Sequence, residues 1–269
     1  MSAIEHRGRV LVIAGSDSGG GAGIQADIKA IAAMGGYAMT AVTAITVQNT
    51  LGVTGIHPIP DEMVGAQMRS VLGDIGADAV KTGMLASAPL IDLVAEVLNA
   101  EGAGLPLILD PVMIATSGDR LIGSDAETAL REKLLPRATL VTPNTLEAQH
   151  LTGIEIEDLH TQIEAARALV AAGAGAALVK GGHMKGETLS DVLVSSRGLE
   201  IMERPRIHTR HTHGTGCTLA SAISARIALG HSLPEAVESA GDYLHEAIKR
   251  APGFGEGHGP VDHFWMLRD

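Results

Sequence analysis

The chain has 269 residues, of which 45% are apolar and 19% are charged, a composition that supports a large core and excludes a disordered chain. With 20 basic and 31 acidic residues the net charge is −11, and only 2% of residues are aromatic, which excludes a basic module that stacks nucleic-acid bases. The one cysteine, Cys217, excludes an internal disulfide and a zinc site made of several cysteines.

Short apolar segments alternate with helical segments along the chain. The first half holds a strand at 10–14, a helix at 22–34, strands at 38–47 and 53–59, a helix that Asp61 caps and that ends at Leu72, a strand at 79–82, a helix at 89–99 and a strand at 107–109. The second half holds a helix at 124–134, a strand at 139–142, a helix from near Asn144, another at 160–172, a strand at 177–180, a hairpin of 189–195 and 199–203, and helices at 217–229 and 234–251. Most strands are apolar on both faces, which predicts an α/β fold with a mainly parallel central sheet covered by helices on both sides.

The chain has no linker, composition break or internal repeat, so we expect a single domain over residues 1–269. The hairpin of residues 38–59 is interpreted as a small β flap appended to the sheet, which favours a homodimer. No apolar run is long enough to cross a membrane, and residues 1–9 lack the apolar region of a secretory signal. We therefore expect a cytoplasmic protein that binds neither membrane nor nucleic acid.

Ligands of such sheets bind beyond the carboxyl ends of the strands, so the functional residues are expected in the loops there. The first loop, residues 15–23, holds five glycines and two serines. Glycines let the backbone approach a ligand, and the following helix offers free N–H groups, which favours a ligand role over packing alone. Gly21, Gly23 and Ala26 also fit the dinucleotide pattern G-x-G-x-x-A. However, Gln48 and Asn49 stand where an acidic residue would bind the ribose, so a dehydrogenase is disfavoured.

The second loop, residues 213–218, reads HGTGCT and opens a long helix. Its small residues would expose N–H groups at the positive end of the helix dipole, an anion hole suited to a phosphoryl group in transfer. Cys217 falls in the first helical turn, where a lowered thiol pKa favours the thiolate; the alternative is a buried structural cysteine. His208, His211 and His213 match no zinc signature and are interpreted as surface or hinge residues.

Polar side chains follow three further strands. Asn144 and Glu147 either form a capping box or hold a hydrated Mg²⁺ between them. Lys180 either binds phosphate as a point charge at the ligand crevice or lies on a solvated rim. Asp110 either supports the metal or only starts a loop.

Eight motifs, spread over nearly the whole chain, carry a resemblance to a known family. They are GSDSGGGAGIQAD (15–27), TVQNTLGV (46–53), KTGMLAS (81–87), LDPVM (109–113), TPNTLEA (142–148), VKGGH (179–183), HTHGTGCTLA (211–220) and GHGPVDHF (257–264). The chain resembles the hydroxymethylpyrimidine/phosphomethylpyrimidine kinases of thiamine biosynthesis, within the ribokinase-like superfamily. Most superfamily members have Asp at the position of Cys217, and Val47 stands where Ala is common in the family.

The resemblance implies a ribokinase-like three-layer α/β/α fold with ATP and Mg²⁺ as cofactors. It implies phosphorylation of 4-amino-5-hydroxymethyl-2-methylpyrimidine to its monophosphate and then to its diphosphate. For single residues it implies a catalytic set of Cys217, Gly214, Thr215 and Gly216, an ATP-binding set of Lys180, Asn144 and Glu147, and a substrate-binding set of Gln48, Gly15, Ala22, Asp27, Met84 and Val112. Asp110 and Glu147 are the expected metal ligands.

The chemistry of its side chain supports a substrate-binding role for Gln48 independently of the resemblance. A carboxamide offers one donor and one acceptor, which match the amino group and the adjacent ring nitrogen of an aminopyrimidine, as Gln matches adenine. Two other functions stay open. Pyridoxal also carries a hydroxymethyl arm on a ring, so a pyridoxal kinase of the same superfamily is one alternative. A binding or regulatory module without catalysis is the other, and the presence of Lys180 and Cys217 disfavours it.

Overall fold

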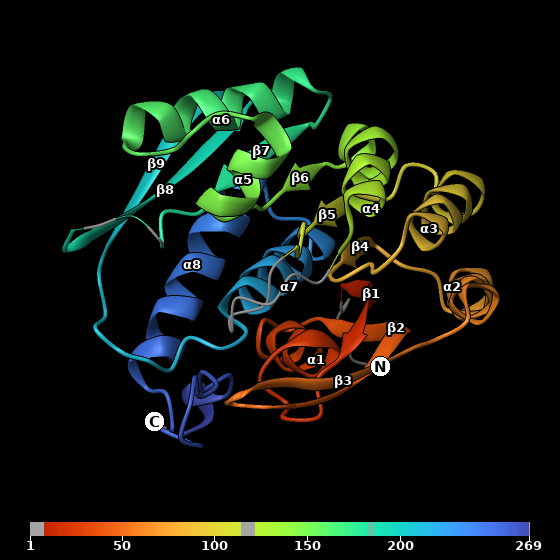
Figure 1. Cartoon of the computed structure of the whole chain (residues 1–269), viewed down its shortest axis with the longest axis horizontal. Coiled ribbons are helices and arrows are strands. Elements are labelled where there is room, and N and C mark those ends of the chain that lie inside the picture. Colours follow the sequence, from red (N-terminus) through yellow and green to blue (C-terminus); the bar gives the residue numbers. More distant parts are fainter. Residues whose placement is uncertain (1–7, 114–121, 183, 185, 269) are drawn as a thin grey trace, which may run out of the picture.

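The computed structural model describes residues 8–113, 122–182, 184 and 186–268. Nine strands within these residues form one sheet in the order β3-β2-β1-β4-β5-β6-β7-β8-β9 (Figure 1). The six central strands, from β2 to β7 in this order, run parallel, whereas β3 at one edge and the β8–β9 hairpin at the other are antiparallel to their neighbours. The strands are β1 (Arg9–Ser16), β2 (Tyr37–Asn49), β3 (Gly52–Pro58), β4 (Ala79–Thr82), β5 (Leu107–Leu109), β6 (Leu140–Val141), β7 (Ala176–Val179), β8 (Thr188–Ser195) and β9 (Gly198–Pro205).

Helices pack on both faces of this sheet, so the predicted three layers are confirmed (Figure 1). One face is covered by α1, α7 and α8, and the other by α2 to α6. The helices are α1 (Gly23–Ala33), α2 (Asp61–Asp74), α3 (Ala88–Ala100), α4 (Ser124–Ala129), α5 (Thr145–Thr152), α6 (Leu159–Ala171), α7 (Thr215–Ala228) and α8 (Leu233–Lys249). No helix in the described ranges has both the length and the apolar character to span a membrane.

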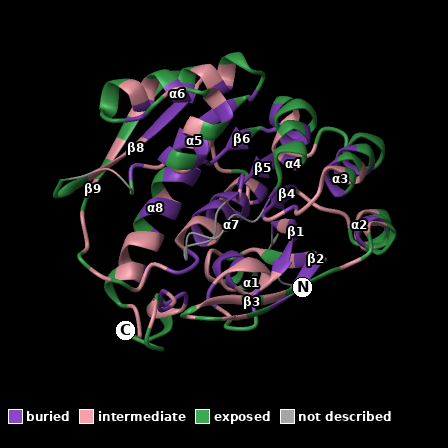
Figure 2. Cartoon of the chain, in the orientation of Figure 1, coloured by how far each residue is buried: buried purple, intermediate pink, exposed green. Residues whose placement is uncertain are grey.

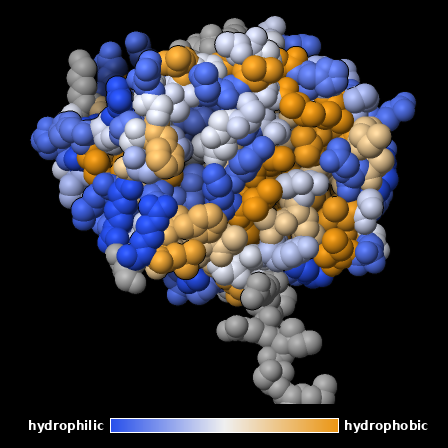
Figure 3. All heavy atoms as spheres, turned by 90° about the horizontal axis from the view of Figure 1, so that it is seen from below, coloured by the Kyte–Doolittle hydropathy of each residue, from blue (hydrophilic) through white to orange (hydrophobic). Residues whose placement is uncertain are grey.

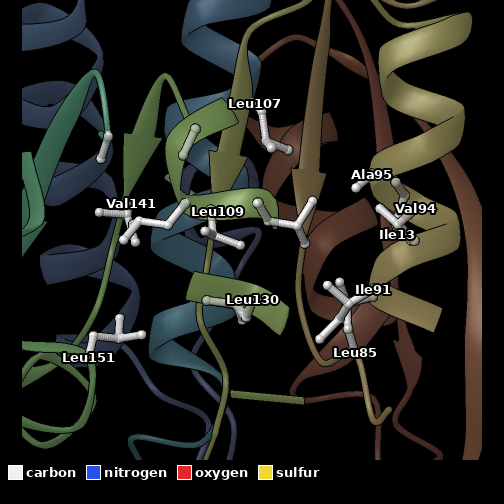
Figure 4. Packing of buried hydrophobic residues seen from close by; sticks show 14 of the residues in the cluster. Ile13, Leu85, Ile91, Val94, Ala95, Leu107, Leu109, Leu130, Val141 and Leu151 are labelled. Atoms are coloured by element: carbon white, nitrogen blue, oxygen red, sulfur yellow. The ribbon is translucent and has the colours of Figure 1, made fainter. Parts of the chain in front are cut away.

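Strand β1 illustrates why the sheet needs helices on both sides. Its side chains alternate, so Leu11 and Ile13 join the hydrophobic cluster under α2 to α6, whereas Val10, Val12 and Ala14 join the cluster under α1, α7 and α8. All five are at most 2% exposed. Figure 4 shows the first cluster, in which Ile13 lies against α3, and Figure 2 shows that the buried residues follow the sheet while the helices expose their outer faces. This double burial is the pattern expected of parallel strands.

Two predicted helix boundaries were wrong. Pro60, and not Asp61, is the N-cap of α2, and Asp61 lies in the first turn, where its charge stabilises the positive end of the helix dipole. The helix expected over 124–134 is regular only to Ala129 and continues as a π-helix over Leu130–Leu134. Pro136 lies two residues further on, in a 3-10 turn over Leu135–Arg137; because it has no N–H and its ring crowds the preceding turn, a regular α-helix cannot run through it.

The β flap is shorter than the predicted hairpin of 38–59. Strand β2 first pairs in parallel with β1, up to Ile45, and only its last part pairs with β3 in antiparallel fashion. The flap is therefore the end of β2 together with β3. In this segment Thr46 and Gln48 line the interior, while Ile45 and Val47 alternate with them and are exposed on the outer side.

Candidate active site

A cavity of about 600 Å³ opens beyond the carboxyl ends of the parallel strands. Its walls come from the loop after β1, the flap, the loops after β4 to β7, the start of α7 and one side of α8. The predicted site residues that line it are Gly15, Ala22, Gln48, Met84, Asp110, Val112, Asn144, Glu147, Lys180, Gly214, Thr215, Gly216 and Cys217. Asp27 does not line it and is completely buried in the wall behind. His183, in the motif after β7, lies outside the described residues.

The two glycine-rich loops pack directly on each other. Gly214, the N-cap of α7, has φ of +77°, and a Cβ at this position would overlap the carbonyl oxygen of Gly21. Gly23 has φ of +56°, and a Cβ there would overlap the carbonyl oxygen of Gly15. Both positions therefore need glycine for conformation and for space. This contact brings residues about two hundred positions apart in sequence to the same wall.

Asp17 organises the first loop. Its carboxylate accepts hydrogen bonds from the N–H groups of Gly19, Gly21 and Ala22, at 2.8–2.9 Å. It also contacts His213 from the second loop, with 2.9 Å between Oδ2 and Nε2. Burial opposes the charge, but these hydrogen bonds outweigh it and hold the pKa of Asp17 below its usual value. His213 is thus a buried residue of the cavity wall, and its interpretation as a surface or hinge residue was wrong.

Gln48 projects into the cavity from the flap. Its Nε2 lies 3.4 Å from His213 Nε2, and its Oε1 lies 3.1 Å from the hydroxyl of Thr46. Thr46 Oγ1 in turn donates to the carbonyl of Ser16 at 2.8 Å. The carboxamide is therefore held from two sides while its edge faces the cavity. Neither Thr46 nor Asp17 was singled out from the sequence, although both lie in the motifs that carry the family resemblance.

The first turn of α7 forms the opposite part of the wall. The N–H groups of Gly216 and Cys217 donate to no acceptor within the described residues, as expected for the first turn of a helix. Lys180 faces this turn, because a Cβ on Gly216 would lie 3.3 Å from its Nζ. Free N–H groups, a positive helix end and an ammonium group together make a site for an anion.

Lys180 and Glu147 flank the buried carboxylate of Asp110. The Nζ of Lys180 lies 3.5 Å from Asp110 Oδ1. Burial alone would lower the pKa of Lys180, but the carboxylates of Asp110 and Glu147 outweigh it and raise the pKa, so this lysine is charged. Burial raises the pKa of Glu147 to about 7, with a further contribution from Asp110, although Lys180 opposes the shift. Lys180 is largely covered, not a solvated rim residue.

Asn144 and Glu147 form the capping box that was one of the two predicted alternatives. The backbone N–H of Asn144 donates to Glu147 Oε2 at 2.8 Å, and the N–H of Glu147 donates to Asn144 Oδ1 at 2.9 Å. Both side chains nevertheless line the cavity. No group of three or more His, Cys, Asp or Glu side chains suited to a metal ion occurs in the described part of the chain. Mg²⁺ at a nucleotide needs fewer, because phosphate oxygens and water complete its shell.

Cys217 lines the cavity and is half-buried, with its thiol taken out of water by the surrounding protein. Burial raises the pKa of this thiol to about 12; the positive charge of Lys81 opposes the shift, and the carboxylates of Asp27 and Asp110 add to it. The prediction of a lowered pKa was therefore wrong. A helix N-terminus favours a thiolate, but here desolvation and two nearby negative charges win.

Lys81 and Asp27 form a buried ion pair behind this turn, which the sequence did not reveal. Lys81 Nζ lies 3.0 Å from Asp27 Oδ1 and 4.0 Å from Asp110 Oδ2, and both Lys81 and Asp27 are completely inaccessible to solvent. Ser221 donates a further hydrogen bond to Asp27 Oδ1 at 2.7 Å. Burial alone would lower the pKa of Lys81, but the facing carboxylate raises it, so the lysine is charged. The available signal was a lysine inside an otherwise apolar strand, which requires a partner.

Known proteins share this arrangement of the chain. A family model described as phosphomethylpyrimidine kinase matches residues 17–262. The hydroxymethylpyrimidine/phosphomethylpyrimidine kinase of Streptomyces coelicolor is 48% identical over 258 residues, which are 96% of this chain and 95% of the relative. The solved phosphomethylpyrimidine kinase of Clostridium difficile is 38% identical with a TM-score of 0.80, covering 90% of this chain and 100% of that one. An ADP complex of Bacillus subtilis pyridoxal kinase is 36% identical with a TM-score of 0.91, covering 98% and 100%.

Proposed function

Because the chain belongs to the phosphomethylpyrimidine kinase family and has its ribokinase-like fold, we propose that it transfers the γ-phosphoryl group of ATP to the hydroxymethyl oxygen of 4-amino-5-hydroxymethyl-2-methylpyrimidine. A second transfer, to the monophosphate, gives the diphosphate used in thiamine biosynthesis. One observation carries the proposal: the same cavity holds Gln48, which suits the pyrimidine ring, and the free N–H groups of α7 beside Lys180, which suit a phosphoryl group.

The phosphoryl end of the cavity supplies charge stabilisation. Phosphoryl transfer passes through a transition state whose charge is spread over the equatorial oxygens, so positioned donors provide most of the catalysis. We assign the free N–H groups of Gly216 and Cys217, in the turn that Gly214 and Thr215 open, to these oxygens and Lys180 to the phosphates of ATP. The apolar side chains of Leu244 and Ile248 from α8 line the same cavity and suit the purine ring.

A divalent cation fits beside this end. Asp110 and Glu147 are buried carboxylates that face the cavity, and burial together with the charge of Asp110 raises the pKa of Glu147, a condition that a cation relieves. We assign them, directly or through water, to Mg²⁺, with Asn144 holding Glu147 in place. Bound Mg²⁺ would neutralise charge on the phosphates of ATP. Turnover is expected to stop in EDTA and to return with excess Mg²⁺, and unchanged turnover in EDTA would contradict the assignment.

Cys217 is assigned to the acceptor hydroxymethyl group. Because its pKa is raised to about 12, the residue is a neutral thiol near pH 7 and is no ready base. A loose transition state needs little help from a base before the P–O bond forms, so the thiol can act by positioning the hydroxyl, whose proton leaves late to an oxygen of the transferred phosphoryl group.

An assay with two acceptors tests the proposal. We expect ATP-dependent phosphorylation of the aminopyrimidine with a kcat/KM well above that for pyridoxal. Pyridoxal is the second candidate, because the solved pyridoxal kinase of Bacillus subtilis matches this fold with a TM-score of 0.91. A higher kcat/KM for pyridoxal would make pyridoxal kinase the first candidate. If neither the aminopyrimidine nor pyridoxal were phosphorylated, both candidate functions would be contradicted.

We also propose that two chains pair through the outer side of the flap. Ile45 and Val47 are 51% and 64% exposed there, and Figure 3 shows apolar atoms gathered on the face seen from below, at the flap edge of Figure 1. Val47→Asp is expected to lower the mass in sedimentation equilibrium from dimer to monomer. The control is Leu267→Asp, at an apolar residue 76% exposed near the other end of the chain, which should leave the mass unchanged.

A further inference from the structure

The carboxamide of Gln48 can read a ring only if its oxygen and its nitrogen have fixed places. The two groups are nearly equal in size, and half a turn of the amide exchanges them, so the protons on neighbouring groups decide which is where. Gln48 has two such neighbours, the hydroxyl of Thr46 on one side and the imidazole of His213 on the other.

On one side of the carboxamide, the Thr46 hydroxyl can only accept a hydrogen bond, so it pairs only with an N–H of Gln48. The hydroxyl has a single proton, and it is used by the carbonyl of Ser16, which lies 2.8 Å away and can only accept. Toward Gln48, 3.1 Å away, Thr46 therefore offers lone pairs. The group of Gln48 that satisfies this hydroxyl is its NH₂ group, which exchanges the amide oxygen and nitrogen relative to their placement in the structure, where Oε1 lies beside Thr46.

On the other side, the Nε2 atom of His213 can only donate a hydrogen bond, so it pairs only with the oxygen of Gln48. Asp17 is a carboxylate that already accepts from three N–H groups of its own loop, and it can only accept from His213. The Nε2 atom of His213 therefore carries a proton. Gln48 lies 3.4 Å from this protonated nitrogen, which has no lone pair left to accept an N–H, whereas a carbonyl oxygen in that place would accept a weak hydrogen bond shared with Asp17.

We propose that Thr46 and His213, the latter fixed by Asp17, are positioning residues that lock the carboxamide of Gln48 with its NH₂ toward Thr46 and its oxygen toward His213. Each end of the carboxamide then keeps one unused hydrogen-bonding group at the cavity. These are the second N–H of the NH₂ beside Thr46 and the second lone pair of the oxygen beside His213. This pair matches a ring edge that presents an acceptor and a donor in one order only. Given the proposed function, on which this role rests, the site selects 4-aminopyrimidines and rejects 4-oxopyrimidines, whose ring N–H and carbonyl have the reverse order.

The test compares the 4-amino substrate with its 4-oxo analogue, 5-hydroxymethyl-2-methylpyrimidin-4-one. The measured quantity is the ratio of the two kcat/KM values, with the KM for ATP as a reference. For the wild type we expect a ratio of about 100 in favour of the amino substrate, the discrimination typical of a paired hydrogen-bonding edge. Thr46→Val keeps the shape but removes the lone pairs, and we expect the ratio to fall at least tenfold with little change in the KM for ATP.

Two matched variants separate this role from a merely structural one. Thr46→Ser keeps the hydroxyl and should keep the wild-type ratio. His213→Gln keeps an N–H near the position of Nε2 and should retain more of the ratio than His213→Leu. A loss of stability alone would lower both kcat/KM values together and leave their ratio unchanged.

The outcomes distinguish the lock from the function on which it rests. If Thr46→Val is active and keeps the wild-type ratio, the lock is wrong and the proposed function stands. If the wild type phosphorylates neither pyrimidine, both are wrong. Should the variants fail to fold, neutron diffraction of the wild type decides: deuterons of the Gln48 amide beside Thr46 support the lock, and deuterons beside His213 overturn it.

Discussion

Lys81 and Asp27 form an ion pair with 3.0 Å between Nζ and Oδ1 and no exposure of either side chain to solvent. A buried pair of this kind contributes little net stability against apolar residues of the same shape, but removal of one partner leaves an uncompensated charge. Lys81→Met is therefore expected to lower the free energy of unfolding by about 3–5 kcal/mol.

Denaturation with urea measures this loss. The control is Arg69→Met, since Arg69 pairs with Glu96 and Glu101 at a partly exposed position where an ion pair contributes at most about 1 kcal/mol. The double variant of Lys81→Met with Asp27→Leu should recover part of the lost stability, because no lone charge remains. Equal small losses for Lys81→Met and Arg69→Met would show that the buried pair is not ionised.

Lys180→Ala tests the phosphoryl end of the cavity. Lys180 is the ammonium group beside the first turn of α7, so its removal deletes a charge that stabilises the transition state. We expect kcat/KM to fall by about 10²-fold or more, measured as ATP-dependent phosphorylation of the aminopyrimidine. Lys133→Ala, at an exposed lysine away from the cavity, is the control and should be silent. Activity of Lys180→Ala within a factor of about two of wild type would remove this lysine from the site.

Glu147 makes stability depend on pH in an unusual direction. Its pKa is about 7 in the folded chain, against an ordinary value near 4.5, so between these values the folded state holds a proton that the unfolded state has lost. The stabilisation that this proton gives the folded state is complete below pH 4.5 and is lost as the pH rises through 7. The loss lowers the free energy of unfolding by at most about 3 kcal/mol. Glu147→Gln should flatten this part of the profile of unfolding free energy, measured without nucleotide or Mg²⁺.

Glu235 supplies the matched control for that profile. It occupies the same position in the capping box of α8, but it is exposed, and its hydrogen bonds with Ser232 lower its pKa. Glu235→Gln should therefore keep the wild-type slope between pH 4.5 and 7. An unchanged slope in Glu147→Gln would mean that the carboxyl group is ionised throughout this range.

Local patterns predicted much of the fold, because they depend on neighbours in sequence. The continuous apolar run of β1 and the spacing of Asn144 and Glu147 are such patterns, and the structure has both the two-sided sheet and the capping box. His213 was misjudged because its partner, Asp17, is 196 residues away, and only the folded sheet makes its environment buried. Cys217 was misjudged for a related reason. Its helix end can be read from the sequence, but the dense packing and the nearby carboxylates that raise its pKa cannot.

Cys217 gives the prediction in which local and tertiary effects oppose each other most directly. A helix N-terminus alone would make the thiol more reactive than free cysteine near neutral pH, whereas a pKa raised to about 12 makes it less reactive. We expect slow alkylation by iodoacetamide at pH 7, with a rate that still rises tenfold per pH unit at pH 10, where free cysteine with a pKa of about 8.5 has levelled off. Denatured chain is the control and should react like free cysteine.

Cys217→Ala should fold and bind ATP but lose most turnover, while Cys217→Asp, which restores the residue common in the superfamily, should keep part of it. Rapid alkylation of the native protein at pH 7 would show that the helix end outweighs burial, and full activity of Cys217→Ala would return this residue to a structural role.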